Sequence, residues 1–206
     1  FKAPLGVAVD ESGNLYIADT FNNRVRKVDA STGVVTTFAG NGSFAFAGDA
    51  GPAEEASLRH PEDVAVDRRG DIYIADTSNH RIRRVLGGPG IIITVAGDGE
   101  SKYAGDSGAA FRASLFQPRS IAFDSDDKLF IADTNNHRIR AVWTVNENIF
   151  LEAGDGFARF GGDTRSPFEA SFNSPSGIVV NSAGDIFVSD TDNGRVRKIT
   201  RENCRI

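Results

Sequence analysis

Two oppositely charged residues recur along the sequence at a spacing that suits charge-assisted contacts. An aspartate and an arginine five residues further on stand in a short polar segment that occurs four times, with successive copies 57 residues apart. A carboxylate and a guanidinium so close together can pair with one another or can form a charged site for a ligand. Because the pair occurs in every copy, we interpret it as a structural brace between two neighbouring strands. The four pairs are Asp19 with Arg24, Asp76 with Arg81, Asp133 with Arg138, and Asp190 with Arg195.

A second recurring group combines an aromatic residue with Gly-Asp in the long connections between copies. An aromatic platform beside a carboxylate suits a sugar or a peptide, and loops on a rigid scaffold often carry binding sites. The alternative is that the ring fills a gap between neighbouring repeats while the aspartate caps a short helical turn. Recurrence favours this alternative. The candidate ligand-binding residues are Phe46, Asp49, Tyr103, Asp106, Phe160 and Asp163.

Histidines and further acidic residues provide a weaker case for a metal site or for catalysis. His80 and His137 share one slot of the repeat without a regular carboxylate partner, and His60 lies elsewhere. Recurring acids at predicted strand ends suit turns, where Asp and Asn are common. These residues are Asp10, Asp67 and Asp124, with Asn181 in the fourth copy. No nucleophile, zinc or phosphate-loop motif is present in the sequence, and the single cysteine, Cys204, near the end of the chain, is a poor candidate for a tuned thiolate. We therefore predict no catalytic residue, no metal ligand and no cofactor.

Residues that depart from the repeat are better indicators of a specific site than residues that follow it. Trp143 stands where other copies have Asp29 and Leu86. Phe44 and Arg159 also break the pattern of their columns, and the three residues are scattered along the sequence.

The composition is that of an ordinary globular domain, with 40% hydrophobic and 25% charged residues among 206. The formal net charge of -5 disfavours a general nucleic-acid surface, which requires a basic patch. No apolar run approaches the roughly 18 residues of a membrane span. We expect no nucleic-acid partner and no membrane span.

Each repeat predicts four short β-strands. The first strand of each repeat follows a proline. The hairpin turn after this strand needs one residue at positive φ, and that position is glycine in three copies and Asp127 in the third copy. The second is apolar at nearly every position, as for a strand covered on both faces. Four antiparallel strands per repeat make a blade, and radially arranged blades make an all-β β-propeller. The predicted strands are residues 7–10, 15–18, 25–28 and 34–38 in the first copy, with equivalents at steps of 57, and residues 52–56 suit one helical turn.

The recurring pattern Pro-x-Gly-Val-Ala-Val-Asp, Gly-Asn-Leu-Tyr-Ile-Ala-Asp-Thr and Asn-x-Arg-Val-Arg-Lys-Val resembles the NHL repeat over nearly the whole chain. The long connections between copies resemble those of NHL arrays in bacterial secreted and surface proteins. The resemblance implies a β-propeller that usually closes with about six blades. We expect residues 1–206 to form a single propeller domain or part of a larger ring. Its repeats would cover about 1–57, 58–114, 115–171 and an incomplete 172–206, completed by self-association or by further blades of a longer chain.

The resemblance also guides the functional expectation. We expect a non-enzymatic binding or scaffold module that mediates protein–protein or glycan interaction, located extracellularly or at the cell surface. The alternative is a lyase- or lactonase-like enzyme, since some six-bladed relatives have such activity. RNA binding, as in some animal NHL proteins, is disfavoured by the acidic balance of the sequence.

Overall fold

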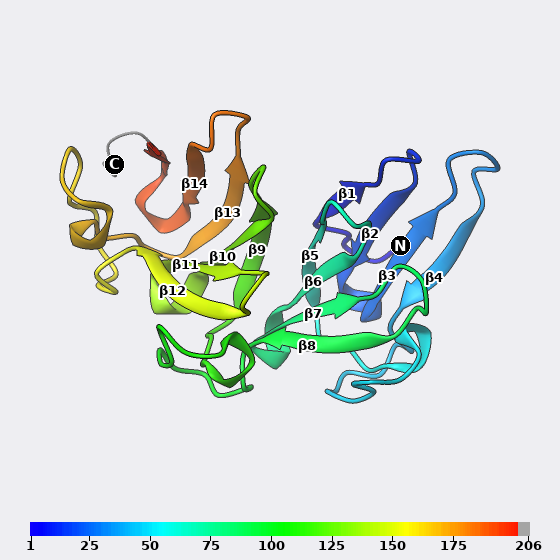
Figure 1. Ribbon diagram of the computed structural model, residues 1–206. Coiled ribbons are helices and arrows are strands. Elements are labelled where there is room, and N and C mark those ends of the chain that lie inside the picture. Colours follow the sequence, from blue (N-terminus) through cyan, green and yellow to red (C-terminus); the bar gives the residue numbers. More distant parts are fainter. Residues whose placement is uncertain (202–206) are drawn as a thin grey trace. The chain divides into compact units, whose positions relative to one another are not determined.

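The computed structural model describes residues 1–201, and its strands form antiparallel sheets of consecutive strands (Figure 1). Within this range there are three four-stranded sheets, β1–β4, β5–β8 and β9–β12, and one three-stranded sheet, β13–β15. Each sheet corresponds to one sequence repeat and is one blade, so the predicted all-β propeller class is confirmed. Cys204 and Ile206 lie outside the described residues.

The chain divides into two compact units, Phe1–Val95 and Ala96–Ile206. The first unit contains two blades and three short 3₁₀ helices. The single domain expected for residues 1–206 stays a prediction. The elements of this unit are β1 (Val7–Val9), β2 (Leu15–Asp19), η1 (Thr20–Asn22), β3 (Arg24–Val28), β4 (Val35–Ala39), η2 (Ala53–Glu55), β5 (Pro61–Val66), β6 (Ile72–Asp76), η3 (Thr77–Asn79), β7 (Arg81–Val85) and β8 (Ile92–Ala96).

The second unit repeats this order over two further blades. Its last described strand is β15. The elements are η4 (Ala110–Arg112), β9 (Pro118–Phe123), β10 (Lys128–Asp133), η5 (Thr134–Asn136), β11 (Arg138–Trp143), β12 (Asn148–Ala153), η6 (Pro167–Glu169), β13 (Pro175–Val180), β14 (Ile186–Asp190), η7 (Thr191–Asn193) and β15 (Arg195–Ile199).

Turn chemistry accounts for several recurring polar residues. In the first hairpin of each blade, Gly13, Gly70 and Gly184 have φ of 82°, 81° and 83°, and Asp127 takes the same role with φ of 57°. The Asp67 carboxylate accepts backbone N–H bonds from Arg69 and Asp71, both at 2.9 Å. The acids at the ends of the first strands therefore stabilise their own turns, as predicted.

The two aligned histidines also have a backbone explanation. His80 and His137 follow η3 and η5 in the left-handed conformation, with φ of 57° and 54°. Asn23 and Gly194 hold the same position in the other blades, with φ of 52° and 63°. Asn and Gly are residues that tolerate this conformation, so the slot is defined by a tight helix-to-strand turn.

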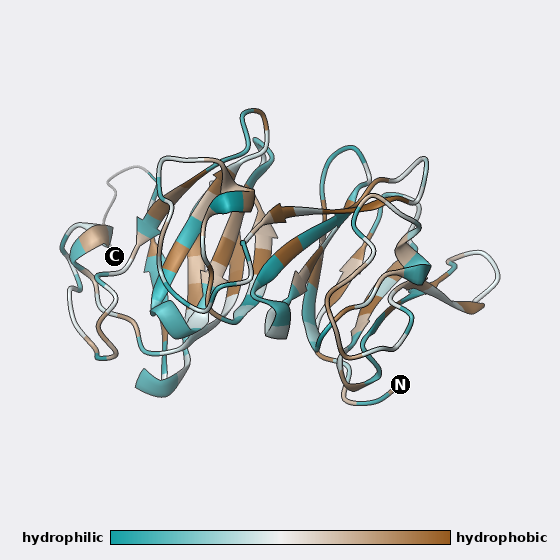
Figure 2. Cartoon of the chain, turned by 90° about the horizontal axis from the view of Figure 1, so that it is seen from below, coloured by the Kyte–Doolittle hydropathy of each residue, from teal (hydrophilic) through white to brown (hydrophobic). Residues whose placement is uncertain are grey.

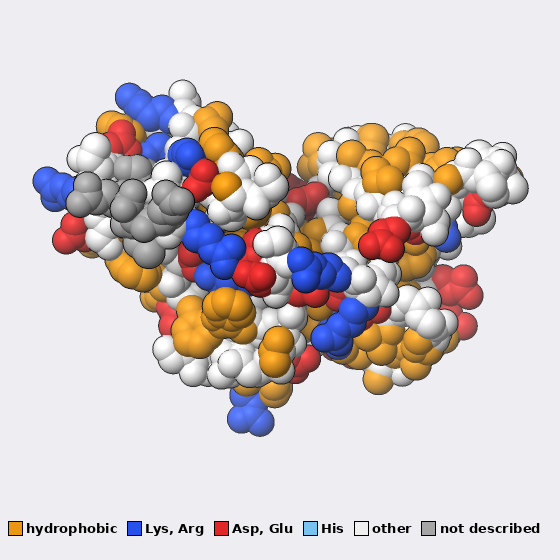
Figure 3. All heavy atoms as spheres, turned by 45° about the horizontal axis from the view of Figure 1, so that its top comes forward, with side chains coloured by type: hydrophobic (Ala, Val, Ile, Leu, Met, Phe, Trp, Pro, Cys, Tyr) orange, Lys and Arg blue, Asp and Glu red, His pale blue; other side chains and the backbone are white. Residues whose placement is uncertain are grey.

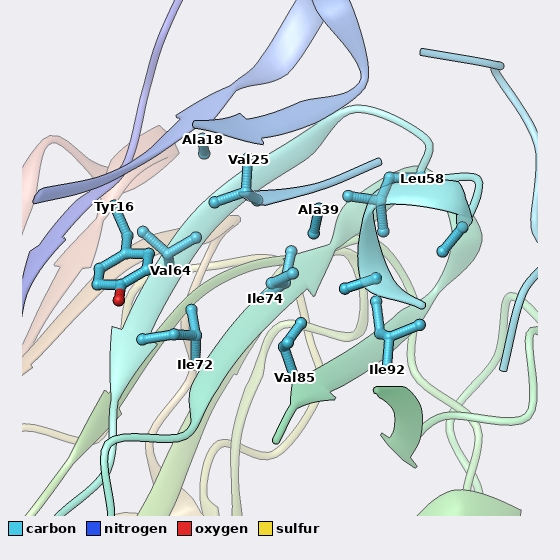
Figure 4. Packing of buried hydrophobic residues seen from close by; sticks show 12 residues of the cluster. Tyr16, Ala18, Val25, Ala39, Leu58, Val64, Ile72, Ile74, Val85 and Ile92 are labelled. Atoms are coloured by element: carbon cyan, nitrogen blue, oxygen red, sulfur yellow. The ribbon is translucent and has the colours of Figure 1, made fainter. Parts of the chain in front are cut away.

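Each unit has its own hydrophobic core, made where the faces of its two blades pack together. In the first unit the core includes Tyr16, Val64 and Ile72, which lie side by side (Figure 4). In the second unit the equivalent core includes Phe130 and Ile186. Hydrophobic residues are concentrated on the strands, whereas several of the short helical turns are hydrophilic (Figure 2).

Candidate functional site

The recurring aspartate is buried beside an arginine that lies between two carboxylates. Asp133, at the end of β10, is 0% exposed, and its Oδ2 lies 3.3 Å from Nη1 of Arg140. Nη2 of Arg140 lies 2.5 Å from Oδ1 of Asp106, in the loop before the blade. We call this arrangement the loop clamp, because it fastens the inter-blade loop to the following blade. The other loop clamps are Arg83 with Asp49 and Asp76, and Arg197 with Asp163 and Asp190.

The predicted ion pair between the aspartate and the arginine five residues further on is therefore wrong by two residues. Arg138 is opposite Asp133 in the β10–β11 register, but its guanidinium donates to the carbonyls of Asn136 and Asp155, each at 3.0 Å. The ion pair goes instead to Arg140, two residues further along the same strand face. The brace itself exists, and the correction applies equally to Arg81 and Arg195, whose places beside Asp76 and Asp190 are taken by Arg83 and Arg197.

The loop aromatics lie over these arginines. The Tyr103 ring centroid is 3.8 Å from Cζ of Arg138 and 4.8 Å from Cζ of Arg140. The Tyr103 hydroxyl donates to Asp106. Cation–π contacts of this kind add to the ion pair and hold the loop down. The equivalent contacts are made by Phe46 over Arg81 and Arg83, and by Phe160 over Arg195 and Arg197.

The loop aspartates do not cap the short helices. The η4 turn begins after Ala109 and has no side-chain cap, while Asp106 is bonded to Arg140. Likewise η2 follows Pro52, and Asp49 is bonded to Arg83. The capping interpretation is therefore wrong. The six predicted ligand-binding residues anchor the loops, and ligand binding by them stays a prediction.

The aspartate of the first blade has other partners among the described residues. The Asp19 carboxylate accepts bonds from the backbone N–H of Lys2 and from Asn22. Arg26, the counterpart of Arg140, has a buried Nε without a hydrogen-bond partner.

Burial raises the pKa of both Asp76 and Asp133 to about 6, against the opposing effect of the bonds and the arginine beside each one. The folded state therefore holds protons between about pH 4 and pH 6 that the unfolded chain releases. These two carboxyl groups favour folding more at pH 5 than at pH 7.

As the pH falls from about 7 to about 5 these two carboxyl groups add stability, whereas the lowered pKa values of His60, His80 and His137 act in the opposite direction. Substitution Asp133→Asn removes one stabilising group, so we expect the change in melting temperature from pH 7 to pH 5 to be less favourable in the variant than in the unsubstituted protein. The measurement is a set of thermal unfolding curves across this pH range. An identical pH dependence in the variant would contradict the assignment.

A cavity of about 350 Å³ opens in the second unit at the junction of its two blades. Its mouth carries Trp143, 40% exposed at the end of β11, and Phe168, 55% exposed on η6. Its floor is apolar and includes the buried residues Phe130, Ile186 and Ile199. We call this cavity the junction pocket. Its size and its apolar lining with few polar groups are typical of ligand sites.

The polar residues of the junction pocket are Asp124, Thr200, Arg201 and one ion pair. Lys128 Nζ lies 2.7 Å from Oε2 of Glu152. The same ammonium lies 4.8 Å from the ring centroid of Phe130 and 5.1 Å from that of Trp143. The pair is thus held in place by aromatic neighbours on one side of the pocket.

Two residues of the junction pocket were already singled out from the sequence, namely Trp143, which breaks the repeat, and Asp124, one of the recurring acids. Lys128, Glu152 and Phe168 also replace different residues in the aligned columns of the first repeat, and that departure was the available signal. The other two repeat-breaking residues lie elsewhere. Phe44 packs against His60 at 4.7 Å, and Arg159 pairs with Asp155 at 3.1 Å.

Residues 1–201 contain neither a metal-binding cluster nor a membrane-spanning helix. No group of three or more His, Cys, Asp and Glu side chains is placed to hold a metal ion in this range. No helix of the described chain is long and apolar enough to cross a membrane. On the face shown in Figure 3, basic side chains lie beside acidic ones and hydrophobic side chains form separate patches.

Comparison with known families agrees with the blade architecture. The family model described as NHL repeat matches residues 1–28, 58–85, 117–141 and 172–199, together more than half of the chain. The chain therefore belongs to the NHL-repeat family.

Relatives with similar sequences are much longer proteins. The protein SUPPRESSOR OF QUENCHING 1, chloroplastic, of Arabidopsis thaliana is 31% identical over 69% of this chain and 14% of its own length. Teneurin-1 of Homo sapiens is 26% identical over 100% of this chain and 8% of its own length. The NHL repeat-containing protein 2 of Gallus gallus is 31% identical over 67% of this chain and 20% of its own length. The chain thus spans at most a fifth of these relatives.

Solved structures share the fold at low sequence identity. An auxiliary nutrient binding protein from Bacteroides thetaiotaomicron has a TM-score of 0.68 and 24% identity, over 94% of this chain and 46% of that one. A gluconolactonase from Xanthomonas campestris has a TM-score of 0.65 and 17% identity, over 98% of this chain and 60% of that one. At these identities the likeness concerns the fold alone.

Proposed function

We propose that this chain is a non-enzymatic binding module whose ligand enters the junction pocket and is a protein or peptide. The observation that carries the proposal is an apolar cavity with a half-exposed tryptophan and phenylalanine at its mouth, formed where the sequence departs from its own repeat. Aromatic residues around a fully desolvated pocket are the usual centre of a binding surface.

The recurring charged residues also favour a binding module over an enzyme. The loop carboxylates that looked available for chemistry are each paired with a buried arginine in a loop clamp. Proteins sharing the fold include both a nutrient binding protein and a gluconolactonase, so the fold does not decide between binding and catalysis. The location outside the cell or at its surface stays a prediction from the resemblance.

Selection of binders tests the proposal. The protein is screened against a phage-displayed random peptide library and against an array of immobilised glycans. We expect peptides to be selected and to bind at least about tenfold more weakly to a Trp143→Ala variant, since loss of a central aromatic residue typically has that effect. Selection of glycans alone would overturn the choice of ligand class.

A matched control distinguishes binding in the pocket from nonspecific binding to exposed aromatic residues. Phe111 occupies in the preceding loop the position that Phe168 occupies at the pocket, and it is 46% exposed without lining the pocket. We expect Phe168→Ala to weaken the selected peptides and Phe111→Ala to leave them unchanged. Equal effects of the two substitutions would refute the assignment of the site.

A further inference from the structure

Three residues that break the repeat come together in the first unit. His60, directly before β5, lies with its ring centroid 4.7 Å from that of Phe44, in the inter-blade loop, and 5.1 Å from that of Phe21, on η1. No other copy of the repeat has an aromatic residue or a histidine at any of these three positions. Phe44 is 50% exposed and Phe21 is 51% exposed. Rings from three segments far apart in sequence thus form one aromatic surface open to solvent.

A cation adjoins this surface. Cζ of Arg59 lies 4.3 Å from the Phe44 ring centroid, and the Arg59 side chain is exposed. In the described chain the Arg59 guanidinium forms no ion pair, whereas Arg83 of the same unit is paired with both Asp49 and Asp76. Stacking on a ring uses the flat face of a guanidinium, so its in-plane N–H groups can still donate to a carboxylate. We call the following residues the aromatic patch: Phe21, Phe44, Arg59 and His60.

The electrostatic potential around the aromatic patch is positive. Burial lowers the pKa of His60, and the charge of Arg59 lowers it further. Burial also lowers the pKa of His80, where the charges of Arg59 and Arg81 both add to the effect. The charge of Arg59 therefore acts on two imidazoles, in a chain whose formal net charge is -5. Such a local positive potential attracts an anionic group.

The second unit has none of these features at the equivalent positions. The residues 114 positions later are Asn135, Ala158, Asn173 and Ser174. The loop there carries an arginine of its own, but Nη2 of this Arg159 lies 3.1 Å from Oδ2 of Asp155. The second unit forms the same kind of blades without an aromatic patch. The patch is therefore not part of the framework that the repeats share.

We propose that the aromatic patch binds an acidic segment of a partner protein, in which an aspartate or glutamate adjoins an apolar side chain. The carboxylate pairs with the in-plane N–H groups of Arg59, and the apolar side chain packs on the exposed rings of Phe21 and Phe44. Both parts are needed, because an exposed ion pair alone contributes little to binding. Arginine and aromatic side chains are common at the centre of protein interfaces. This site belongs to the first unit and does not involve the junction pocket.

The His60 ring reports directly on the site, because the chain has only three histidines. Variants His80→Asn and His137→Asn assign the imidazole signals, since asparagine holds the same turn position in the first blade. N-acetyl-Leu-Glu-Glu-Leu-amide is titrated into the protein while proton NMR follows the His60 ring. We expect a saturable shift with a Kd on the order of 1 mM, as suits a short flexible peptide. The neutral analogue N-acetyl-Leu-Gln-Gln-Leu-amide should produce no saturable shift.

Two substitutions test the two parts of the site. We expect Arg59→Gln and Phe44→Ala each to weaken the acidic peptide at least about threefold. The melting temperature should be nearly unchanged, since both side chains are exposed. The matched control is Arg112→Gln, where an exposed arginine of the second unit lies 5.3 Å from the Phe111 ring centroid, and it should change nothing. Undiminished binding to both Arg59→Gln and Phe44→Ala would refute the site.

Other outcomes separate this inference from the proposed function. Equal binding of the acidic and neutral peptides would overturn the choice of an acidic segment. A saturable His60 shift with hexauridylate and none with the acidic peptide would assign the patch to nucleic acid and overturn the inference. A change in Trp143 emission without a shift of the His60 ring would place the peptide in the junction pocket, so that the proposed function stands and the inference is wrong. If His60 responds while no library peptide binds at Trp143, the proposed pocket is wrong and the aromatic patch stands.

Discussion

Substitution Arg140→Ala is expected to destabilise the protein by about 3 to 5 kcal/mol, because it leaves a buried carboxylate without its cation. The Asp133 carboxylate is 0% exposed, and Arg140 is its only ion-pair partner among the described residues. The same change removes the donors to the carbonyls of Ser114 and Ala104 and frees Asp106. For a chain of this size the loss lowers the melting temperature on the order of 10 °C.

Arg138→Ala is the matched control for this prediction. Arg138 lies on the same strand, is only partly buried, contacts the same Tyr103 ring and bonds two carbonyls, but it has no carboxylate partner in the described chain. We expect a loss of about 1 kcal/mol. Equal losses for the two arginines would contradict the loop clamp as described and would favour the pairing of Asp133 with Arg138.

Two further measurements identify the orphaned carboxylate as the cause. The penalty of Arg140→Ala should shrink at pH 5, since a carboxyl group whose pKa is raised by burial is protonated there and no longer charged. The double variant Arg140→Ala with Asp133→Asn should cost less than the two single substitutions together. A penalty independent of pH and strictly additive would point to lost packing.

Gly48→Ala is expected to destabilise the first unit by about 2 to 5 kcal/mol. Gly48 has φ of 88°, and a Cβ built on it would lie 2.6 Å from Cα of Ala56. The left-handed conformation costs an alanine about 1 to 2 kcal/mol. Overpacking against backbone adds about 1 to 3 kcal/mol more. The loop would move, and with it Asp49, which is bonded to Arg83.

Gly70→Ala isolates the steric part of this effect. Gly70 has φ of 81°, but a Cβ there would meet nothing within 4 Å. We expect only the conformational penalty of about 1 to 2 kcal/mol. Thermal or denaturant unfolding of both variants measures the difference. If Gly48→Ala were no worse than Gly70→Ala, the close approach of the loop to Ala56 would not hold in solution.

Much of this protein is determined by the sequence alone. A period of 57 residues predicted one blade per repeat, because each copy alternates apolar strands with turn residues whose conformations are restricted. The positive φ of Gly13 and Asp127 and the turn bonds of Asp67 followed from the same local chemistry. Such features depend on neighbouring residues, so a sequence pattern records them directly.

Only the tertiary structure decided which of two arginines pairs with the buried aspartate. Arg138 and Arg140 lie on one face of β11 and both fit the pattern, yet the loop that carries Asp106 approaches the second. The junction pocket likewise depends on side chains from two blades that lie far apart in sequence, Glu152 and Ile186 among them. A repeat predicts what every blade shares. The lining of a pocket between two blades can be seen only when both blades are in place.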